Sequence, residues 1–257
     1  MTIAFHVNHD KPGADTVRAR LAVLARDLGM EISDETPEVV VVLGGDGTML
    51  SAVHQFPGIP LLGLNLGSLG YLAGVEQPRF EDAIRALQAG DFSLSRRTAL
   101  TVRGRIALND VVVSRGVSGH AAVIELVVDD RPASSFFADG LVLATPTGST
   151  AYSLSAGGPI LLPDSQSFVI TPICPHALTS RPLVLRDTSR LTLRLRARPG
   201  AESLEVFADG ASLGSLGVEE DLVVEKAKTG VPLVELEGYD PYEVLNRKLG
   251  WSGSSIR

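Results

Sequence analysis

The sequence predicts an α/β N-terminal domain with a parallel sheet, followed by a β-rich, sandwich-like C-terminal domain. In residues 1–95, apolar runs alternate with segments of helical periodicity, which is typical of a doubly wound parallel sheet. In residues 96–238, runs with a period of two are separated by turn residues, which indicates antiparallel β structure. From 239 the spacing is helical again, and we expect residues 239–257 to return to the first domain with a C-terminal helix.

The expected elements follow in order along the chain. In the first domain they are a strand at 3–7, a helix at 15–28, a strand at 38–43, a short helix from 48, a strand at 60–64 and a helix at 79–87. The unbroken apolar run 39–43 suits a parallel strand that is buried on both faces. In the second domain the period-two runs are 99–102, 106–113, 123–128, 141–144, 191–195 and 222–224.

Composition and charge exclude several classes of protein. The chain has 257 residues, of which 44% are hydrophobic and 21% charged, as in an ordinary globular protein. A net charge of −7 argues against broad binding to nucleic acid, which depends on Lys and Arg contacts with phosphates. With neither a signal-peptide pattern nor an apolar stretch of membrane-spanning length, we expect a cytoplasmic protein. The one cysteine, Cys174, lies in an apolar run and is predicted to be a buried thiol.

The run Gly44, Gly45, Asp46, Gly47, Thr48 lies directly after a predicted buried strand and before a helix. Ligands of open parallel sheets bind at the carboxyl ends of the strands. Glycines there allow phosphates to approach the backbone, and the helix N-terminus supplies free N–H groups. A carboxylate would repel a phosphate beside it, so Asp46 is interpreted as a base, or as a ligand of a substrate hydroxyl or Mg²⁺. The alternative is a tight turn in which Asp46 caps the helix.

Two further segments carry polar side chains beside apolar strands. Asn109 and Asp110 precede the strand 111–113, and an adjacent amide and carboxylate can hydrogen-bond a ribose diol. The alternative is a simple turn at the start of the strand. Residues 145–153 carry five hydroxyl side chains between apolar flanks, which favours a nucleotide-reading loop as much as a solvated one. The absence of G-x-x-x-x-G-K-[ST] excludes a P-loop enzyme, and the absence of G-x-G-x-x-G after a strand argues against a dehydrogenase.

The GGDGT run resembles a superfamily that includes NAD kinases, diacylglycerol kinases and sphingosine kinases. Further segments are similar to the NAD kinase family in particular: 64–72, 108–110, 139–159 and the ending 248–252. The resemblance runs from about Ile3 to Ser252. It implies transfer of a phosphoryl group from ATP, with polyphosphate as an alternative donor, to the 2′-hydroxyl of the adenosine ribose of NAD.

The resemblance also implies roles for individual residues. Asp46 would be the general base, Asn109 and Asp110 would hold the ribose, and Asp139 would lie near the nicotinamide. The other implied nucleotide-binding residues are Gly44, Gly45, Gly47, Thr48, Tyr71, Thr150, Ala151, Tyr152 and Ser155. Mg²⁺ or another divalent cation would accompany the donor phosphates, with its protein ligands unassigned. The family resemblance further implies a homodimer or homotetramer.

Two alternatives remain open at this point. A lipid kinase could use the same glycine-rich run, but the chain lacks an apolar membrane-binding stretch and carries the Asn109–Asp110 pair. A non-catalytic regulator that binds NAD or NADP could keep the fold, but an intact Asp46 counts against this.

Overall fold

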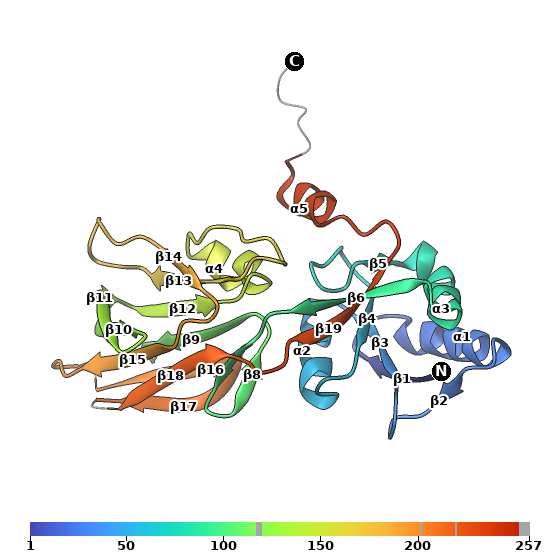
Figure 1. Ribbon diagram of the computed structural model, residues 1–257, viewed down its shortest axis with the longest axis horizontal. Coiled ribbons are helices and arrows are strands. Elements are labelled where there is room, and N and C mark those ends of the chain that lie inside the picture. The colour runs from blue at the N-terminus through green and yellow to red at the C-terminus, as the bar shows by residue number, and fades with distance from the viewer. Residues whose placement is uncertain (117–119, 201, 219, 252–257) are drawn as a thin grey trace, which may run out of the picture. The chain divides into compact units, whose positions relative to one another are not determined.

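The structure is a computed structural model that describes residues 1–116, 120–200, 202–218 and 220–251. It contains two compact units, one formed by Met1–Arg96 together with the chain from Val231 onward, the other by Arg97–Gly230. The predicted α/β and β-rich parts are confirmed (Figure 1). The chain returns to the first unit at Val231 rather than at 239, because 231–236 forms a strand of the first sheet. Residues 252–257 lie outside the described part.

A seven-stranded sheet forms the centre of the first unit. Its strand order is β2-β1-β3-β4-β19-β6, with β5 paired to β4. The pairs β1–β2, β1–β3, β3–β4, β4–β5 and β4–β19 are all parallel. The strands are β1 (Thr2–Val7), β2 (Glu31–Ile32), β3 (Val39–Gly44), β4 (Leu61–Asn65), β5 (Val75–Glu76), β6 (Phe92–Arg97) and β19 (Val231–Leu236).

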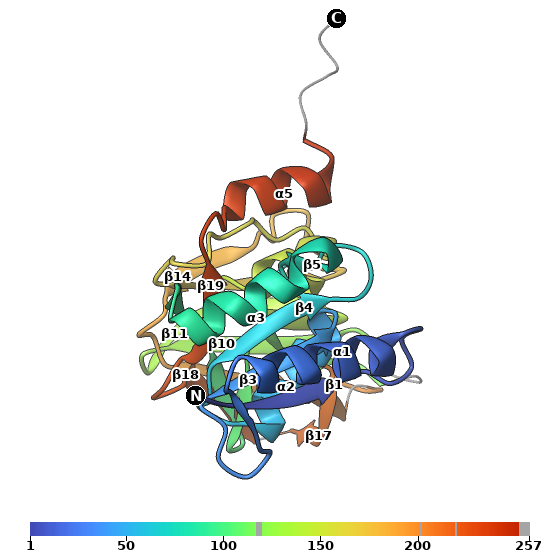
Figure 2. The ribbon, with the colours of Figure 1, turned by 90° about the vertical axis from the view of Figure 1, so that its right-hand side faces the viewer.

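The helices α1 (Ala14–Asp27) and α3 (Phe80–Ala89) cover one face of this sheet, and α2 (Asp46–Gln55) covers the other (Figures 1 and 2). The unit also contains the 3-10 helix η1 (Gln77–Arg79) and the helix α5 (Pro241–Leu249), which lies off the sheet. Every residue of β3 is buried, as its apolar run predicts. Val39, Val41 and Leu43 share one apolar cluster with residues of α1 and α3. The helix α2 packs on the opposite face, which places its N-terminus at the carboxyl end of β3.

The C-terminal helix α5 belongs to the first unit, as predicted. Its N-terminus is capped by Asp240, whose side chain accepts a hydrogen bond from the backbone N–H of Tyr242 at 2.8 Å. Arg247 donates two hydrogen bonds to Glu76, with N–O distances of 2.9 and 3.1 Å. This paired contact attaches α5 to the segment that follows β4.

Two six-stranded antiparallel sheets form the second unit. Their orders are β11-β10-β15-β18-β7-β8 and β14-β13-β12-β9-β16-β17. The strands are β7 (Leu100–Val102), β8 (Arg105–Ala107), β9 (Asp110–Ser114), β10 (Ala122–Val128), β11 (Arg131–Ala138), β12 (Gly140–Ala144), β13 (Ser167–Ile173), β14 (Leu183–Arg186), β15 (Leu191–Arg196), β16 (Ser203–Ala208), β17 (Ala211–Gly217) and β18 (Asp221–Lys226). The 3-10 helix η2 (Gly148–Thr150) and the short helix α4 (Tyr152–Ser155) follow β12.

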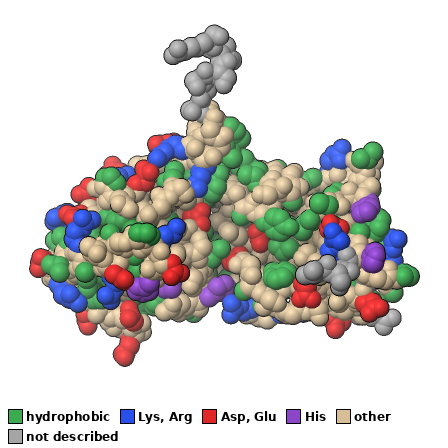
Figure 3. Space-filling model, turned by 180° about the vertical axis from the view of Figure 1, so that it is seen from behind, with side chains coloured by type: hydrophobic (Ala, Val, Ile, Leu, Met, Phe, Trp, Pro, Cys, Tyr) green, Lys and Arg blue, Asp and Glu red, His purple; other side chains and the backbone are tan. Residues whose placement is uncertain are grey.

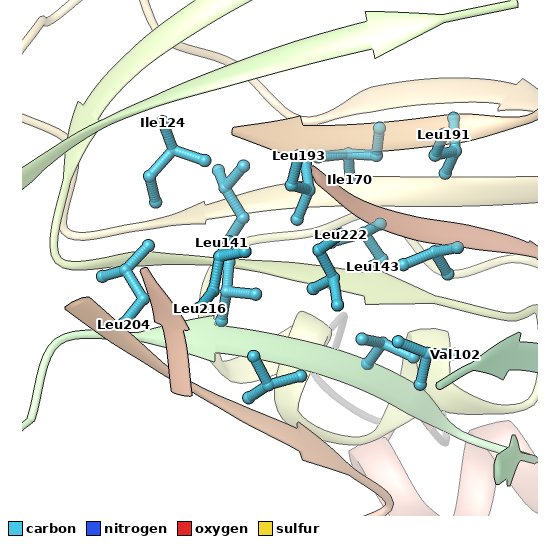
Figure 4. Packing of buried hydrophobic residues seen from close by; sticks show 14 of the residues in the cluster. Val102, Ile124, Leu141, Leu143, Ile170, Leu191, Leu193, Leu204, Leu216 and Leu222 are labelled. Atoms are coloured by element: carbon cyan, nitrogen blue, oxygen red, sulfur yellow. The ribbon is translucent and has the colours of Figure 1, made fainter. Parts of the chain in front are cut away.

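One apolar core joins the two sheets of the second unit. Side chains from both sheets, among them Leu141, Leu143, Leu193 and Leu222, pack against one another between the layers (Figure 4). Alternate residues of each strand point into this core, which is the physical basis of the period-two pattern in the sequence. The second unit is therefore a β-sandwich.

The prediction that Cys174 is buried is wrong. Its side chain is exposed. The strand β13 ends at Ile173, and Cys174 begins the following loop with a φ of 44°. The apolar run therefore stops contributing to the core one residue before the thiol.

Candidate active site

The glycine-rich run forms the junction between β3 and α2. Gly45 is the N-cap residue of α2 and Asp46 is its first helical residue. The alternative in which Asp46 caps the helix is therefore wrong. The backbone N–H of Gly45 donates to Thr48 Oγ1 at 3.3 Å. A Cβ atom at Gly44 would lie 2.1 Å from the same Oγ1, so the close packing of Thr48 requires glycine there.

The Asp46 carboxylate is held by the backbone of a distant segment. Oδ2 accepts from the N–H of Tyr71 at 2.9 Å, and Oδ1 accepts from those of Leu72 at 2.9 Å and Ala73 at 3.1 Å. A Cβ atom at Gly70 would lie 2.0 Å from Oδ1, so glycine is needed for this approach. Each carboxylate oxygen has two lone pairs. Counting partners among the described residues, Oδ1 is saturated, whereas Oδ2 keeps one lone pair for an external donor.

Tyr71 lies beside this carboxylate. Burial raises the pKa of its phenol, and the negative charge of Asp46 raises it further. The phenol therefore stays protonated at neutral pH and can donate a hydrogen bond. Lys248 of α5 lies with Nζ 5.5 Å from the centre of the Tyr71 ring, which brings a positive charge from the C-terminal helix to the ring.

A cavity of about 460 Å³ opens beside the start of α2. It is lined by residues at the end of β1 and on α2, namely His6, Val7, Asn8, His9, Asp10, Gly47, Thr48 and Ser51. Burial lowers the pKa of His6, although its hydrogen bond with Gln55 opposes the shift. His6 is therefore a neutral imidazole at pH 7. The sequence motifs did not indicate the residues from β1, since single His and Asn residues carry no signature.

In the second unit, Asn109 and Asp110 lie at the start of β9, where three strand ends meet. Asp110 pairs with Ala144 at the end of β12, and the N–H of Thr145 donates to the carbonyl of Asn109 at 2.9 Å. A Cβ atom at Gly148 would lie 1.9 Å from that carbonyl oxygen. The loop that follows β12 is therefore pressed directly against Asn109.

Asp209, at the end of β16, is a residue that the sequence motifs missed. Its carboxylate accepts from the N–H groups of Leu108 at 2.7 Å, Asn109 at 2.8 Å and Asp110 at 3.1 Å. Asp209 and Gly210 have φ angles of 47° and 80° in the turn between β16 and β17. The Asp-Gly dipeptide, a hairpin-turn signal, could have located the turn, but not its long-range contacts.

Asp110 is a buried acid, with 6% of its surface exposed. Burial raises its pKa to about 7, and the neighbouring charge of Asp209 contributes to the same shift. Asp110 is thus a buried side chain at the first position of β9, and its role in binding a ribose stays a prediction.

Several hydroxyl groups of the loop after β12 are used within the protein. Thr145 Oγ1 donates to the carbonyl of Leu108 at 2.6 Å, and Ser149 Oγ donates to that of Pro146 at 2.6 Å. Ser153 is also buried. These three side chains hold the loop in shape, so the solvated-loop alternative is wrong for them.

The loop residues assigned to the nucleotide are more accessible. Thr150 and Ala151 are half-buried, whereas Tyr152 and Ser155 are exposed. Thr150 Oγ1 donates to the carbonyl of Thr147 at 3.0 Å, which leaves its lone pairs available. The buried and accessible side chains thus divide the loop into a supporting part and a part that a ligand can reach.

Asp139 lies apart from Asn109 and Asp110. It precedes β12, whereas Asp110 pairs with Ala144 at the other end of that strand. At the usual rise per residue, the two ends are about 17 Å apart. Asp139 accepts from Nε of Arg115 in an ion pair of 3.0 Å. The structure therefore does not bring Asp139 into the cluster around Asn109.

No group of three or more His, Cys, Asp or Glu side chains that could hold a metal ion occurs in the part of the chain that the structure describes. Mg²⁺ sites in enzymes that act on nucleotides commonly use one or two carboxylates plus substrate phosphates.

Two family models match the chain in succession. The model of the ATP-NAD kinase N-terminal domain matches residues 3–92, and that of the ATP-NAD kinase C-terminal domain matches residues 108–236. The chain belongs to the ATP-NAD kinase family. It is therefore an enzyme, a phosphotransferase of the NAD kinase type.

Curated relatives of the ATP-NAD kinase family agree with this assignment. An NAD kinase of Chloroherpeton thalassium is 39% identical over 230 residues, which cover 86% of this chain and 81% of the relative. One of Gemmatimonas aurantiaca is 40% identical over 243 residues, covering 89% and 83%.

Solved structures show the same fold. Yeast NADH kinase complexed with NADH superimposes with a TM-score of 0.86 and 24% identity, covering all of this chain and 89% of the other. An Archaeoglobus fulgidus NAD kinase in complex with ATP has a TM-score of 0.80 and 24% identity, covering 97% and 98%.

Proposed function

We propose that Asp46 is the general base of this kinase, which moves the terminal phosphoryl group of ATP to the 2′-hydroxyl of the adenosine ribose of NAD. The observation that supports this role is the free lone pair on Oδ2 of a carboxylate fixed by three backbone N–H groups. A hydroxyl that donates to Oδ2 passes its proton there as the new O–P bond forms and the bond between the terminal phosphorus and the oxygen of the leaving ADP breaks. Fixed orientation of the base reduces the entropic cost of the reaction.

The donor phosphates bind at the β3–α2 junction in this proposal. Gly45 and Gly47, where a Cβ atom would meet open space, allow close approach, and Gly44 makes room for Thr48. The free N–H groups at the N-terminus of α2 favour negative charge. The adjoining cavity of about 460 Å³ offers room for the phosphates of the donor, either the triphosphate of ATP or inorganic polyphosphate. A bound Mg²⁺, or another divalent cation, supplies neutralisation of the charge that develops on the transferring group.

NAD is held by the second unit in this proposal. The amide of Asn109 and the carboxylate of Asp110 hydrogen-bond ribose hydroxyls. Thr150, Ala151, Tyr152 and Ser155 lie against the adenine side, and Asp139, at the far end of β12, lies toward the nicotinamide. That separation is compatible with an extended dinucleotide. We assign Tyr71, which lies beside Asp46, to the nucleotide-binding residues of the first unit.

We further propose a cytoplasmic homodimer or homotetramer that binds neither nucleic acid nor membrane. On the face in Figure 3, acidic and basic side chains of the described residues are interspersed, and a concentrated basic surface of the kind that binds phosphate backbones is not seen there. None of the helices in the described residues has the length and apolar character needed to cross a bilayer.

The direct test is to incubate the purified protein with NAD⁺, Mg²⁺ and either ATP or polyphosphate, and to measure NADP⁺. We expect NADP⁺ to form with ATP. The reaction with polyphosphate shows whether polyphosphate can replace ATP as the phosphoryl donor. A folded protein that binds NAD but forms no NADP⁺ with either donor would contradict the proposal.

Replacing Asn109 by Ala is expected to weaken NAD binding about tenfold or more, because a buried or charged hydrogen bond contributes roughly 1–3 kcal/mol. Titration calorimetry with NAD⁺ measures the effect. The fold should survive, since the backbone contacts of Asn109 with Asp209 and Thr145 do not involve its side chain. Unchanged NAD affinity in the folded variant would remove this motif from the site.

A further inference from the structure

We infer that Asp209 is a positioning residue for NAD: its carboxylate holds the backbone of Leu108–Asp110 and thereby aims the two side chains assigned to the ribose. The inference rests on the proposed role of Asn109 and Asp110. Asp209 is almost one hundred residues away in the chain and contacts three consecutive N–H groups of the motif.

The geometry distinguishes this contact from ordinary hairpin packing. The backbone pairing between β9 and β16 ends with the N–H of Asp209 donating to the carbonyl of Asp110 at 3.0 Å. Beyond this last backbone pair, the carboxylate of Asp209 accepts hydrogen bonds from the N–H groups of Leu108 and Asp110, where the chain enters β9. Because all three donors converge on one carboxylate, the motif has little freedom to rotate Asn109 or Asp110 away from a ligand.

The carboxylate of Asp209 also affects the pKa of Asp110. Burial is the larger cause of the raised pKa of Asp110, and the charge of Asp209 is the second. The strand β12, which pairs with β9, carries no ionisable side chain. On β16, Glu205 pairs with Ser114 at the far end of β9, and Arg105 of β8 is exposed. Asp209 is thus the charged group that faces Asp110 at short range.

The test is the pH dependence of NAD affinity in the full-length enzyme and its Asp209→Asn variant. Asn tolerates the left-handed backbone of the turn but has one acceptor oxygen and no charge. In the parent enzyme, affinity should fall as the pH drops through about 7, because Asp110 becomes protonated. In the variant, affinity should fall about tenfold, and the midpoint should move to lower pH, since the pKa of Asp110 loses the contribution of Asp209. KM for NAD should rise with far less change in kcat.

Asp129→Asn is the matched control. Asp129 is also a turn aspartate of the second unit, with a φ of 50°, and its Oδ1 accepts from the N–H of Arg190 at 2.8 Å. This variant should leave both the NAD affinity and the midpoint unchanged. If Asp209→Asn does not fold, Asp209→Glu replaces it. Glu keeps the charge but displaces the oxygens, so affinity should fall while the midpoint stays near 7.

Three outcomes would overturn the inference. They are an unchanged NAD affinity in folded Asp209→Asn, a loss of affinity with no movement of the midpoint, and an unchanged affinity in Asp209→Glu. The Asn109→Ala variant separates failure of the inference about Asp209 from failure of the proposed function.

If Asn109→Ala binds NAD normally, the assignment of Asn109 to the ribose is itself wrong. If Asn109→Ala weakens binding and Asp209→Asn does not, only the role of Asp209 fails.

Discussion

Replacing Asp46 by Asn is expected to lower kcat by about 10²–10⁴, the usual contribution of a general base. The variant keeps the size of the side chain and one acceptor oxygen, which can still accept from the N–H groups of Leu72 and Ala73. It loses the proton acceptor on the Oδ2 side. Removal of the negative charge should leave ATP affinity unchanged or improve it, because the phosphates meet less repulsion.

The structure adds a control to this experiment. In the variant, the amide nitrogen would face the N–H of Tyr71, and two donors cannot hydrogen-bond each other. The free energy of unfolding, measured by denaturation in urea, should therefore fall by about 1–3 kcal/mol. Asp82→Asn, at an exposed acid in the first turn of α3, tests the general effect of losing one charge near a helix N-terminus. Near-normal turnover in a folded Asp46→Asn protein would remove Asp46 from the mechanism.

Removal of divalent cations is expected to abolish turnover. Transfer of a phosphoryl group from a triphosphate requires neutralisation of charge on the phosphates, and the glycine-rich run contains no lysine to supply it. NADP⁺ formation after exhaustive chelation, followed by addition of Mg²⁺, measures the dependence. Full activity in the chelated enzyme would contradict the proposed chemistry.

A melting experiment tells where the cation binds. A metal ion that binds the folded state of a protein but not its unfolded state raises the melting temperature. If the cation is carried by the substrate, chelation should leave the melting temperature of the substrate-free protein unchanged. A marked fall would instead indicate a metal site in the protein itself.

The sequence predicts much of this fold because its periodicities reflect burial. The run 39–43 is buried on both faces of a parallel sheet, and alternate residues of the period-two runs in the second unit face its core. The prediction of one run at 106–113 is wrong, because these residues are divided between β8 and β9, which lie in different sheets. The strands β9 and β12 are buried on both faces and do not alternate between core and surface. The predicted domain boundary at 238 places residues 231–236 in the second domain, whereas they form strand β19 of the first sheet. Apolar residues indicate that a strand is buried, but they do not indicate which of two sheets it joins.

The candidate site could be predicted in part. The junction at Asp46 was found because a strand, glycines and a helix start are adjacent in sequence. The partners of Asp46 at 71–73 and those of Asp209 at 108–110 could not be found in this way. Backbone N–H groups are present at nearly every residue. A side chain that accepts hydrogen bonds from them therefore requires no particular residue type at the donor positions, and the sequence does not indicate the contact. The Asp46–Gly70 approach depends on a missing Cβ, which only the folded chain explains.

The two carboxylates share one arrangement: each accepts hydrogen bonds from a nest, that is, from three successive backbone N–H groups, at 71–73 for Asp46 and at 108–110 for Asp209. Such nests bind free anions. Here the protein supplies its own anion, which excludes a substrate phosphate from either nest. Truncation of Asp46 or Asp209 to Ala would open the nest to chloride or phosphate from the buffer, so the stability of an alanine variant would depend on the salt used. A neutral amide keeps one acceptor oxygen in the nest, and it therefore reports on the role of charge more directly than truncation does.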